Sequence, residues 1–234
     1  MLLIELRKKV CQANLDLVKF KLVILTWGNV SGIDRKSNLV VIKPSGIDYE
    51  KLTYDKMVIV DLKTGKIVEG SLSPSSDTPT HLEIYKAFKN VSTVVHTHSQ
   101  WATILSQNMC SIDCAGTTHA DYFYGTIPCT RNLTRNEIIN DYEFNTGRLI
   151  VSTFQNKKIN YENIPAVLVS HHGPFVWGKS TNEAVHNAVV LEYVAKMYYF
   201  NLSLVKRRKI KIDNVLLDKH FLRKHGKNAY YGQR

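Results

Sequence analysis

Residues 57–70 read MVIVDLKTGKIVEG, and this stretch carries the clearest local signal for the fold. Two short apolar runs flank a polar centre, with Thr64 and Gly65 at the expected tip, which is typical of a β-hairpin. Upstream, LVILTWGNVSG (22–32) and NLVVIKPSG (38–46) read as two further strands separated by a polar turn, and residues 2–20 have helical spacing. The first third of the chain therefore predicts one helix followed by several strands.

Helical and strand-like segments alternate irregularly along the rest of the chain. Further helices are predicted over 80–90, from about 99, over 135–154 as one or two helices, from a capping box of Ser180 and Glu183, and over 213–225. Strand segments are predicted over 94–99 and 165–180. No linker, internal repeat or regular strand–helix–strand alternation interrupts them, so we predict one α/β domain spanning residues 1–234.

Composition narrows the function classes. Of 234 residues, 44% are hydrophobic and 22% charged, which is ordinary for a globular protein, and the net charge is +11. The densest basic run, KRRKIK at 206–211, lacks interleaved aromatic residues, so we interpret it as a solvated loop; a nucleic-acid-binding protein is the alternative. No apolar run reaches the roughly 18 residues of a membrane span, and the N-terminus does not read as a signal peptide. We expect a cytoplasmic protein with reduced cysteines that binds neither nucleic acid nor membranes.

The run VVHTHS places His96 and His98 two residues apart at the end of an apolar segment. Side chains on a strand alternate faces, so both imidazoles are expected on one face. Two histidines are a partial metal site, because a catalytic Zn²⁺ usually takes three protein ligands and leaves one position open. A second pair, His171 and His172, ends the apolar run AVLVS, and Asp77 lies in the polar turn SPSSDTPT. Three imidazoles and a carboxylate would suit Zn²⁺ or a similar divalent ion, although Asp77 alone is equally an N-cap or turn residue.

Two turns have the composition of a phosphate site. The segments KPSG (43–46) and SPSSD (73–77) are rich in hydroxyl and backbone donors, and Lys43 adds charge. Taken alone, each is more often an ordinary turn. A third segment, GPFVWGKS at 173–180, matches the P-loop pattern, but its bulky centre reads as another strand, and we expect no ATP binding. The pattern G-x-G is absent from the chain, so a dinucleotide fingerprint is missing too.

Acid/base candidates gather in two further places. The segment GTTHADYFYGTIP (116–128) contains Asp121 beside tyrosines and glycines, and the tail contains Tyr230 and Tyr231. The ordinary pKa values of Asp and Tyr differ widely, which suits a proton-transfer pair when burial shifts them. Packing of aromatic residues in a turn-rich segment is an equally good interpretation.

Eight blocks, taken in order along the whole chain, carry a resemblance to a known family: TWGNVS, IKPSG, PSSDTPTH, VVHTHS, GTTHADYFYGTIPCTR, HGPFVWGK, AVHNAVVLE, and LLDKHFLRKHG followed by AYYGQ. Together they resemble the class II aldolase/epimerase family, and within it the sugar-phosphate 4-epimerases. The resemblance implies a three-layer α/β/α subunit with a mostly antiparallel central sheet. It also implies a homotetramer with fourfold symmetry and active sites between neighbouring subunits.

The resemblance assigns a role to each candidate residue. It makes His96, His98 and His172 the zinc ligands, with Asp77 near or on the metal; His171 is the fallback for His172, which directly precedes Gly-Pro. The sugar phosphate would lie against Asn29, Lys43, Ser45, Gly46, Ser75 and Ser76. Asp121 and Tyr231 would form the acid/base pair contributed by an adjacent subunit, supported by Thr117, His220 and Arg223.

The implied reaction interconverts L-ribulose 5-phosphate and D-xylulose 5-phosphate. The hydrogen on C4 is not α to the ketone and cannot be removed as an enolising proton, and a transient oxidation at C4 would need a nicotinamide, whose fingerprint is missing. The remaining route breaks and re-forms the C3–C4 bond, with Zn²⁺ as the Lewis acid. The alternative is a class II aldolase that releases both fragments. Aldolases of the family that cleave fuculose or rhamnulose phosphates carry a glutamate at the position of Asp77, and the shorter aspartate favours the epimerase.

Overall fold

A single sheet forms the centre of the computed structural model, which describes residues 1–204 and 210–231. Within those residues the sheet has seven strands in the order β4-β3-β2-β1-β5-β7-β6, and each neighbouring pair is antiparallel. The strands are β1 (Asn29–Asp34), β2 (Leu39–Ile42), β3 (Val58–Asp61), β4 (Ile67–Glu69), β5 (Thr93–His96), β6 (Ala166–Leu168) and β7 (Pro174–Gly178). The expected antiparallel central sheet is therefore confirmed.

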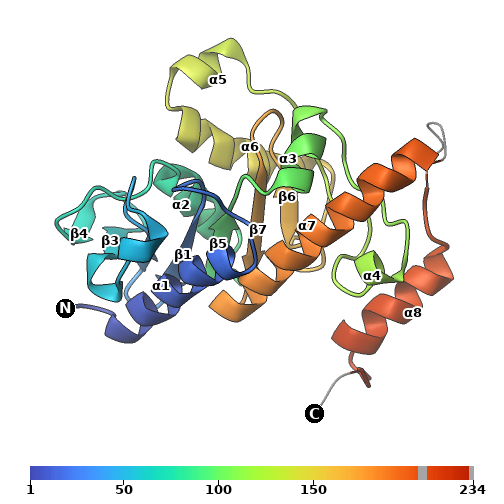
Figure 1. Ribbon diagram of the computed structural model, residues 1–234, viewed down its shortest axis with the longest axis horizontal. Coiled ribbons are helices and arrows are strands. Elements are labelled where there is room, and N and C mark those ends of the chain that lie inside the picture. The colour runs from blue at the N-terminus through green and yellow to red at the C-terminus, as the bar shows by residue number, and fades with distance from the viewer. Residues whose placement is uncertain (205–209, 232–234) are drawn as a thin grey trace.

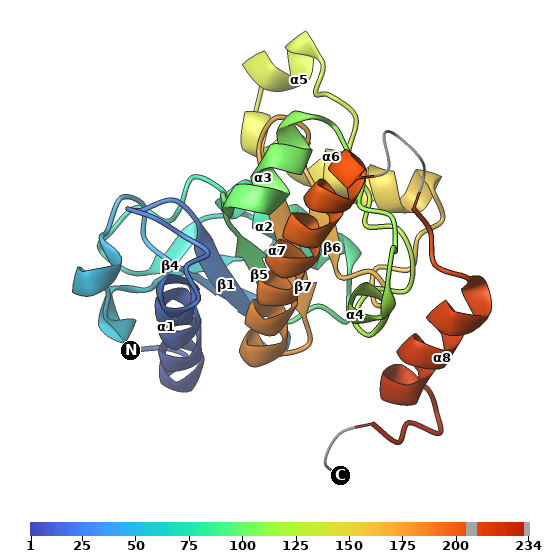
Figure 2. The same ribbon diagram turned by 45° about the vertical axis from the view of Figure 1, so that its right-hand side comes forward.

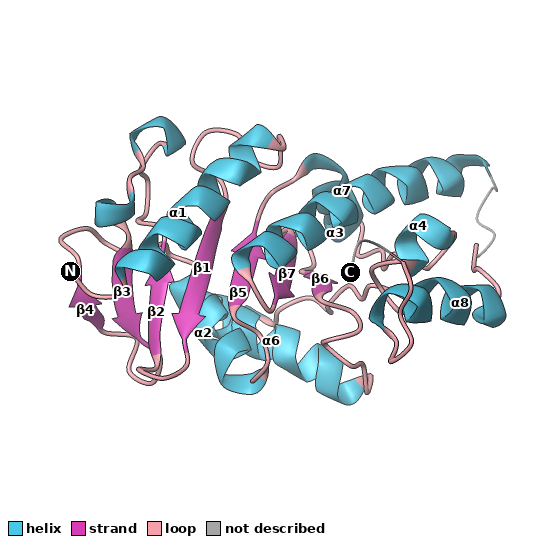
Figure 3. Cartoon of the chain, turned by 90° about the horizontal axis from the view of Figure 1, so that it is seen from below, coloured by secondary structure: helices cyan, strands magenta, loops and turns pink. Residues whose placement is uncertain are grey.

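Helices cover both faces of this sheet, which gives three layers (Figure 3). The helices α1, α3 and α7 pack on one face, and α2 and α6 lie on the other. Ser31 Oγ on β1 hydrogen-bonds with His81 Nδ1 on α2 over 2.7 Å and so ties the second layer to the sheet. Their bounds are α1 (Ile4–Lys19), α2 (Thr78–Ala87), α3 (Gln100–Gln107), α6 (Tyr142–Asn156) and α7 (Thr181–Leu204).

Three further helices lie at the margins. The helices α4 (Thr117–Ala120) and α8 (Asn214–His225) pack on each other beyond the β6 end of the sheet (Figures 1 and 2). The helix α5 (Arg135–Ile139) precedes α6 and begins with a capping box of Thr134 and Glu137. The sheet and its two helical layers thus form the core, and α8 is an appendage at its margin.

The apolar runs of the sequence become strands buried on both faces. The residues of β5 are all buried, and so are those of β7 and most of β1. Because helices exclude water from both sides of the sheet, its central strands favour continuous β-branched residues over alternation. This explains why VVH and AVL read as apolar runs.

Most local predictions are confirmed, but the strand predicted over 94–99 ends at His96. The hairpin of residues 57–70 is β3 paired with β4, and Asp61 Oδ1 accepts hydrogen bonds from Thr64 N and Thr64 Oγ1 at its turn. The segment over 135–154 is two helices, separated where Asp141 has a φ of 54°. The P-loop-like GPFVWGKS contributes β7, as its bulky residues indicated.

The strand predicted over 22–32 is wrong at its start. Regular pairing begins only at Asn29, since Leu25 has a left-handed φ of 52° and is exposed. Gly28 then has a φ of 109°, and a Cβ there would lie 2.9 Å from the carbonyl oxygen of His96. The chain therefore makes a tight turn before β1, close to the end of β5.

Three other expectations concern the basic run, the cysteines and membrane spans. Residues 206–209 of the basic run 206–211 lie outside the described residues. The four cysteines, Cys11, Cys110, Cys114 and Cys129, are free. Among the described helices, none has the length and apolar character required to cross a membrane.

Candidate active site

The sheet register brings the first candidate residues together. In the antiparallel pairing of β1, β5 and β7, Asn29 lies opposite His96, and His96 lies opposite Phe175. Directly opposed residues project their side chains to the same face of a sheet. The ring of Phe175 accordingly stacks on His96 at 4.1 Å between centroids. The hairpin of β6 and β7 carries His172 in its turn and delivers it to the same end of β5.

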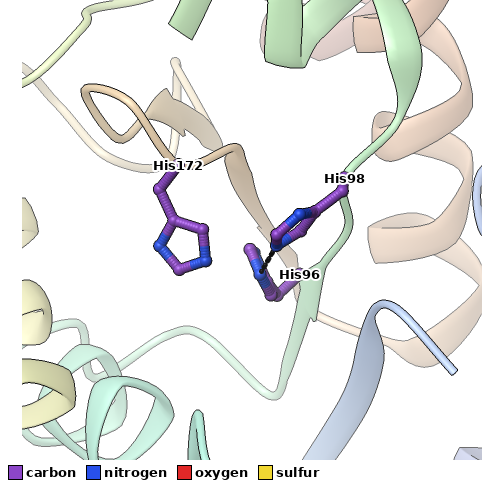
Figure 4. A group of neighbouring side chains, drawn as sticks. All are labelled: His96, His98 and His172. Carbon is purple, nitrogen blue, oxygen red and sulfur yellow. Dashed lines mark hydrogen bonds between the residues drawn. The ribbon is translucent and has the colours of Figure 1, made fainter. Parts of the chain in front are cut away.

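Three imidazoles converge at this end of the sheet (Figure 4). Nε2 of His98 lies 3.1 Å from Nε2 of His96, and the ring of His172 lies 4.7 Å from that of His96 and 5.0 Å from that of His98. The atoms that the three residues could offer a metal ion all lie within 4.8 Å of one another. The fallback His171 lies elsewhere in the turn: it is exposed, its φ is 58°, and its N–H donates to Ser106 O.

The protonation of this cluster suits a metal ion. Nδ1 of His96 hydrogen-bonds over 2.9 Å to the carbonyl oxygen of Pro174, which can only accept, so Nδ1 carries the proton and the lone pair of Nε2 is available to a metal. Burial lowers the pKa of His98 to about 4 and that of His172 to about 3, and His96 acts in the same direction. The imidazoles of His98 and His172 are neutral near pH 7, the form that binds divalent ions.

Asp77 supplies a carboxylate beside the imidazoles. It precedes α2 as its N-cap residue, but its side chain does not cap the helix. Instead Oδ2 accepts a hydrogen bond from Asn29 Nδ2 over 2.8 Å and lies 4.0 Å from Nε2 of His96. Burial would raise the pKa of Asp77, but the neighbouring imidazoles and Asn29 hold it below its ordinary value. The donor set therefore contains an anion, which fits a divalent cation.

A cavity of about 620 Å³ opens beside these groups, and all the residues predicted to bind the sugar phosphate line it. Its lining includes Asn29, Lys43, Ser45, Gly46, Ser75 and Ser76, together with Asp77 and the three histidines. Oδ1 of Asn29 is buried and has no hydrogen-bond partner in the structure. A buried oxygen of this kind favours a ligand that donates a hydrogen bond, such as a hydroxyl group.

Lys43 is a buried cation in the lining of the same cavity. It is 2% exposed, and its Nζ donates to the carbonyl oxygens of Ile47 and Pro44 over 2.8 and 3.3 Å. Burial lowers its pKa. Asp48 is ion-paired with Lys51, and no carboxylate in the described part of the chain is ion-paired with Lys43. Since an unpaired buried charge is costly, the site favours an anionic ligand.

The two serine-containing turns are joined to each other. Ser45 N donates to Ser73 O and Ser75 N donates to Lys43 O, each over 3.0 Å. Gly46 has a φ of 66°, a left-handed conformation that favours glycine in this turn. The turns KPSG and SPSSD, which lie far apart in sequence, therefore line one cavity together.

The remaining predicted residues form a second cluster elsewhere in the chain. Asp121 accepts hydrogen bonds from Arg223 Nη2 at both carboxylate oxygens over 3.0 Å, and His220 Nδ1 lies 3.0 Å from Oδ1. The ring of Tyr231 lies 4.5 Å from the guanidinium of Arg223, and the carbonyl of Thr117 accepts the N–H of Asp121. None of these residues lines the histidine cavity of the same chain.

Several residues at these sites escaped the sequence analysis. Tyr142 OH lies 3.3 Å from Nδ1 of His172, and Trp27 packs at 6.4 Å from the ring of His98. Glu143 lines the same cavity, and His225 Nε2 hydrogen-bonds with Asp121 O over 2.9 Å. Tyr142 and Glu143 were part of a segment with simple helical spacing, so only the packing of α6 against the cavity identifies them.

An antiparallel α/β layer fold with three histidines near the end of β5, next to a cavity lined by the buried Lys43, defines a chain of the class II aldolase type. Residues 8–199 match the family described as Class II Aldolase and Adducin N-terminal domain. The chain belongs to this family, and membership indicates an enzyme.

Solved structures of the family share the fold. L-fuculose 1-phosphate aldolase superposes with a TM-score of 0.77 at 22% identity, covering 92% of this chain and 94% of that one. L-fuculose-1-phosphate aldolase from Thermus thermophilus gives 0.65 at 20% identity, with 87% and 97% covered. A sugar-phosphate aldolase from Thermotoga maritima gives 0.66 at 20% identity, with 88% and 98% covered.

Proposed function

We propose that this protein is a metal-dependent epimerase that interconverts L-ribulose 5-phosphate and D-xylulose 5-phosphate. One observation carries the proposal: a single cavity combines a cluster of three histidines and Asp77 with the buried cation Lys43, which is ion-paired with no carboxylate of the described residues. The first group suits a metal and the second suits a phosphate. A ligand that carries both a chelating polyol and a phosphate would satisfy both groups at once.

The phosphate would bind at the two joined turns. Lys43 would provide charge, and the hydroxyl groups of Ser45, Ser75 and Ser76 would donate hydrogen bonds. Gly46 leaves open space, since a Cβ there would meet no atom within 4 Å. This pocket would hold the aldehyde fragment after cleavage, so that its effective concentration for the return step stays high.

The metal would be held by His96, His98 and His172, with Asp77 near or on it. Zn²⁺ is the ion we propose, because three imidazoles with one open position are its usual catalytic donor set. When bound, it would supply a Lewis acid that stabilises the negative charge developed on the substrate as the C3–C4 bond breaks. Asn29 orients Asp77 through its Nδ2, and its Oδ1 is available to a substrate hydroxyl.

The reaction breaks the C3–C4 bond and re-forms it on the other face of the aldehyde. Cleavage releases the proton of the C4 hydroxyl, and re-addition must return it from the opposite side, so one base and one acid are needed. We propose Asp121 and Tyr231 for these roles, with Thr117, His220 and Arg223 supporting them. Because these residues do not line the histidine cavity of their own chain, they would come from an adjacent subunit of a homotetramer.

The carboxylate at position 77 supports the epimerase over the aldolase alternative. An aldolase must protonate the enediolate carbon before it releases the second fragment, and this requires a mobile acid next to that carbon. Asp77 is short, held ionised and anchored by Asn29, so it is poorly suited to this task. An epimerase needs no such proton, since the enediolate is consumed by the returning aldehyde.

Turnover of L-ribulose 5-phosphate by the purified protein tests the proposal, before and after chelation and again after addition of Zn²⁺. We expect D-xylulose 5-phosphate to form, to cease on chelation and to return with the metal. Accumulation of free glycolaldehyde phosphate would establish the aldolase instead. An unchanged substrate with metal-loaded protein would refute the epimerase, and aldol cleavage of other ketose phosphates would be tested next.

Two variants test the histidine cluster and the Asp121–Tyr231 pair independently. His98→Asn is expected to lose the metal and most turnover while remaining folded. Tyr231→Phe is expected to retain the metal but to slow one proton transfer, with Tyr230→Phe as the matched control in the same tail. Equal turnover of Tyr231→Phe and wild type in both directions would remove this tyrosine from the mechanism.

A further inference from the structure

The three histidines are not supported in the same way. His96 is part of β5, and His172 lies in the tight turn that leads into β7. The strand ends at His96, however, so His98 lies outside the sheet, in the segment between β5 and α3. It directly precedes Ser99, the N-cap residue of α3. The position of His98 therefore depends on where α3 begins.

The N-terminus of α3 is capped from another helix. The side chain of Ser99 makes no capping hydrogen bond. Instead, Glu192 in the middle of α7 accepts the backbone N–H of Trp101 at Oε1 over 2.8 Å and that of Ala102 at Oε2 over 3.0 Å. The first N–H groups of a helix have no partner within the helix, and a carboxylate there is also favoured by the helix dipole.

Further contacts hold the same turn of α3 in place. The ring of Trp101 packs at 5.4 Å from Tyr199 and 5.5 Å from Phe200, both on α7. The turn before β7 also approaches this segment, because Gly173 lies so close that a Cβ would be 2.7 Å from the carbonyl oxygen of Thr97. The segment that carries His98 is therefore fixed by the turn before β7 and by the start of α3.

We propose that Glu192 is a positioning residue for the metal ligand His98. By holding the first turn of α3 on α7 with both carboxylate oxygens, it sets the distance of His98 from His96 and His172. This inference rests on the metal site of the proposed function, but it does not depend on which reaction the site catalyses. An ordinary helix cap would stabilise the fold and leave metal binding unchanged.

The affinity for Zn²⁺, measured without substrate by competition with a chromogenic chelator, distinguishes these roles. We expect the dissociation constant of Glu192→Ala to rise at least tenfold. Glu192→Gln, whose amide oxygen can replace only one carboxylate oxygen, should show a smaller rise. It also carries the test if the alanine variant does not fold.

Glu183→Ala is the matched control on the same helix. Its carboxylate also accepts a backbone N–H, that of Lys179 over 2.8 Å, at the start of α7. We expect both alanine variants to lower the melting temperature but only Glu192→Ala to weaken Zn²⁺ binding. The absorption spectrum of the Co²⁺-loaded protein should change only in Glu192→Ala, because it reports the coordination geometry.

A double-mutant cycle with His98→Asn identifies the route of the effect. If Glu192 acts through His98, adding Glu192→Ala to His98→Asn should weaken Zn²⁺ binding no further, measured at Zn²⁺ concentrations high enough to load the weakened site. The proposal is overturned if Glu192→Ala and Glu192→Gln bind Zn²⁺ within threefold of wild type, or if the loss is equal in both backgrounds. If His98→Asn itself leaves Zn²⁺ affinity unchanged, the metal site and this inference fail together. If the variants show the expected Zn²⁺ affinities but the wild-type protein has no epimerase turnover, only the proposed reaction is refuted.

Discussion

Gly173→Ala is the sharpest test of how the fold sets the spacing of the metal ligands. Gly173 follows His172, and a Cβ added to it would lie 2.7 Å from Thr97 O and 3.6 Å from Cδ2 of His98. The nearest atom belongs to the backbone between His96 and His98, so no flexible side chain can move aside. The methyl group can be accommodated only if the two segments that carry the ligands separate.

The size of the effect follows from these distances. Ordinary contact begins at 3.4 Å, so the segments must separate by about 0.7 Å, whereas metal–ligand distances tolerate about 0.2 Å. Overpacking of this kind costs about 1–3 kcal/mol. At about 2–4 °C per kcal/mol for a chain of this length, the melting temperature should fall by about 2–12 °C. Misplacement of the ligands should weaken Zn²⁺ binding about 10- to 100-fold.

Chelator competition and thermal unfolding of the same preparations measure both effects. Gly147→Ala is the matched control, because its Cβ would lie 2.7 Å from Glu83 Cβ and 3.0 Å from Thr80 O, between α6 and α2. We expect it to lose stability but to retain the wild-type affinity for Zn²⁺. A Gly173→Ala protein that binds Zn²⁺ within threefold of wild type, or a Gly147→Ala protein with an equal loss of affinity, would refute the reasoning.

Three further predictions concern the cavity, the second cluster and the core. Lys43→Met should raise KM for the sugar phosphate at least tenfold in steady-state kinetics and leave Zn²⁺ affinity unchanged, since it removes only the buried cation; an unchanged KM would exclude Lys43 from the phosphate site. Asp121→Asn, which removes the charge facing Arg223 and His220, should abolish most turnover at wild-type Zn²⁺ content, and full activity would contradict its role as acid or base. Burial lowers the pKa of His119 to about 4 from 6.5, so the unfolded chain binds more protons between these pH values. The contribution of His119 to stability against urea should therefore be complete above pH 6.5 and fall by up to about 3 kcal/mol on acidification to pH 4, and a His119→Gln protein with the wild-type slope would disprove this origin.

The sequence by itself determined most of the elements and most of the residues that line the histidine cavity. Hairpin, capping and apolar-run signals are local, since they depend on residues within one or two turns of chain, and this is why β3, β4, α1 and α7 were predictable. The spacing of His96 and His98 likewise indicated a metal site before any contact was known. The irregular turn before Asn29 was missed, because its left-handed residues include Leu25, whose type does not favour that conformation.

Only the tertiary structure decided how these residues meet. His172 rather than His171 faces the cluster because the turn between β6 and β7 gives His171 a φ of 58° and exposes it. His98 reaches the site from outside the strand, and Glu192, about 90 residues further along the chain, is placed at α3 by the packing of α7. Asp121, at the end of α4, meets Arg223 only because α8 docks against α4. Such pairings join segments far apart in sequence through close packing and hydrogen bonds, and no local periodicity encodes them.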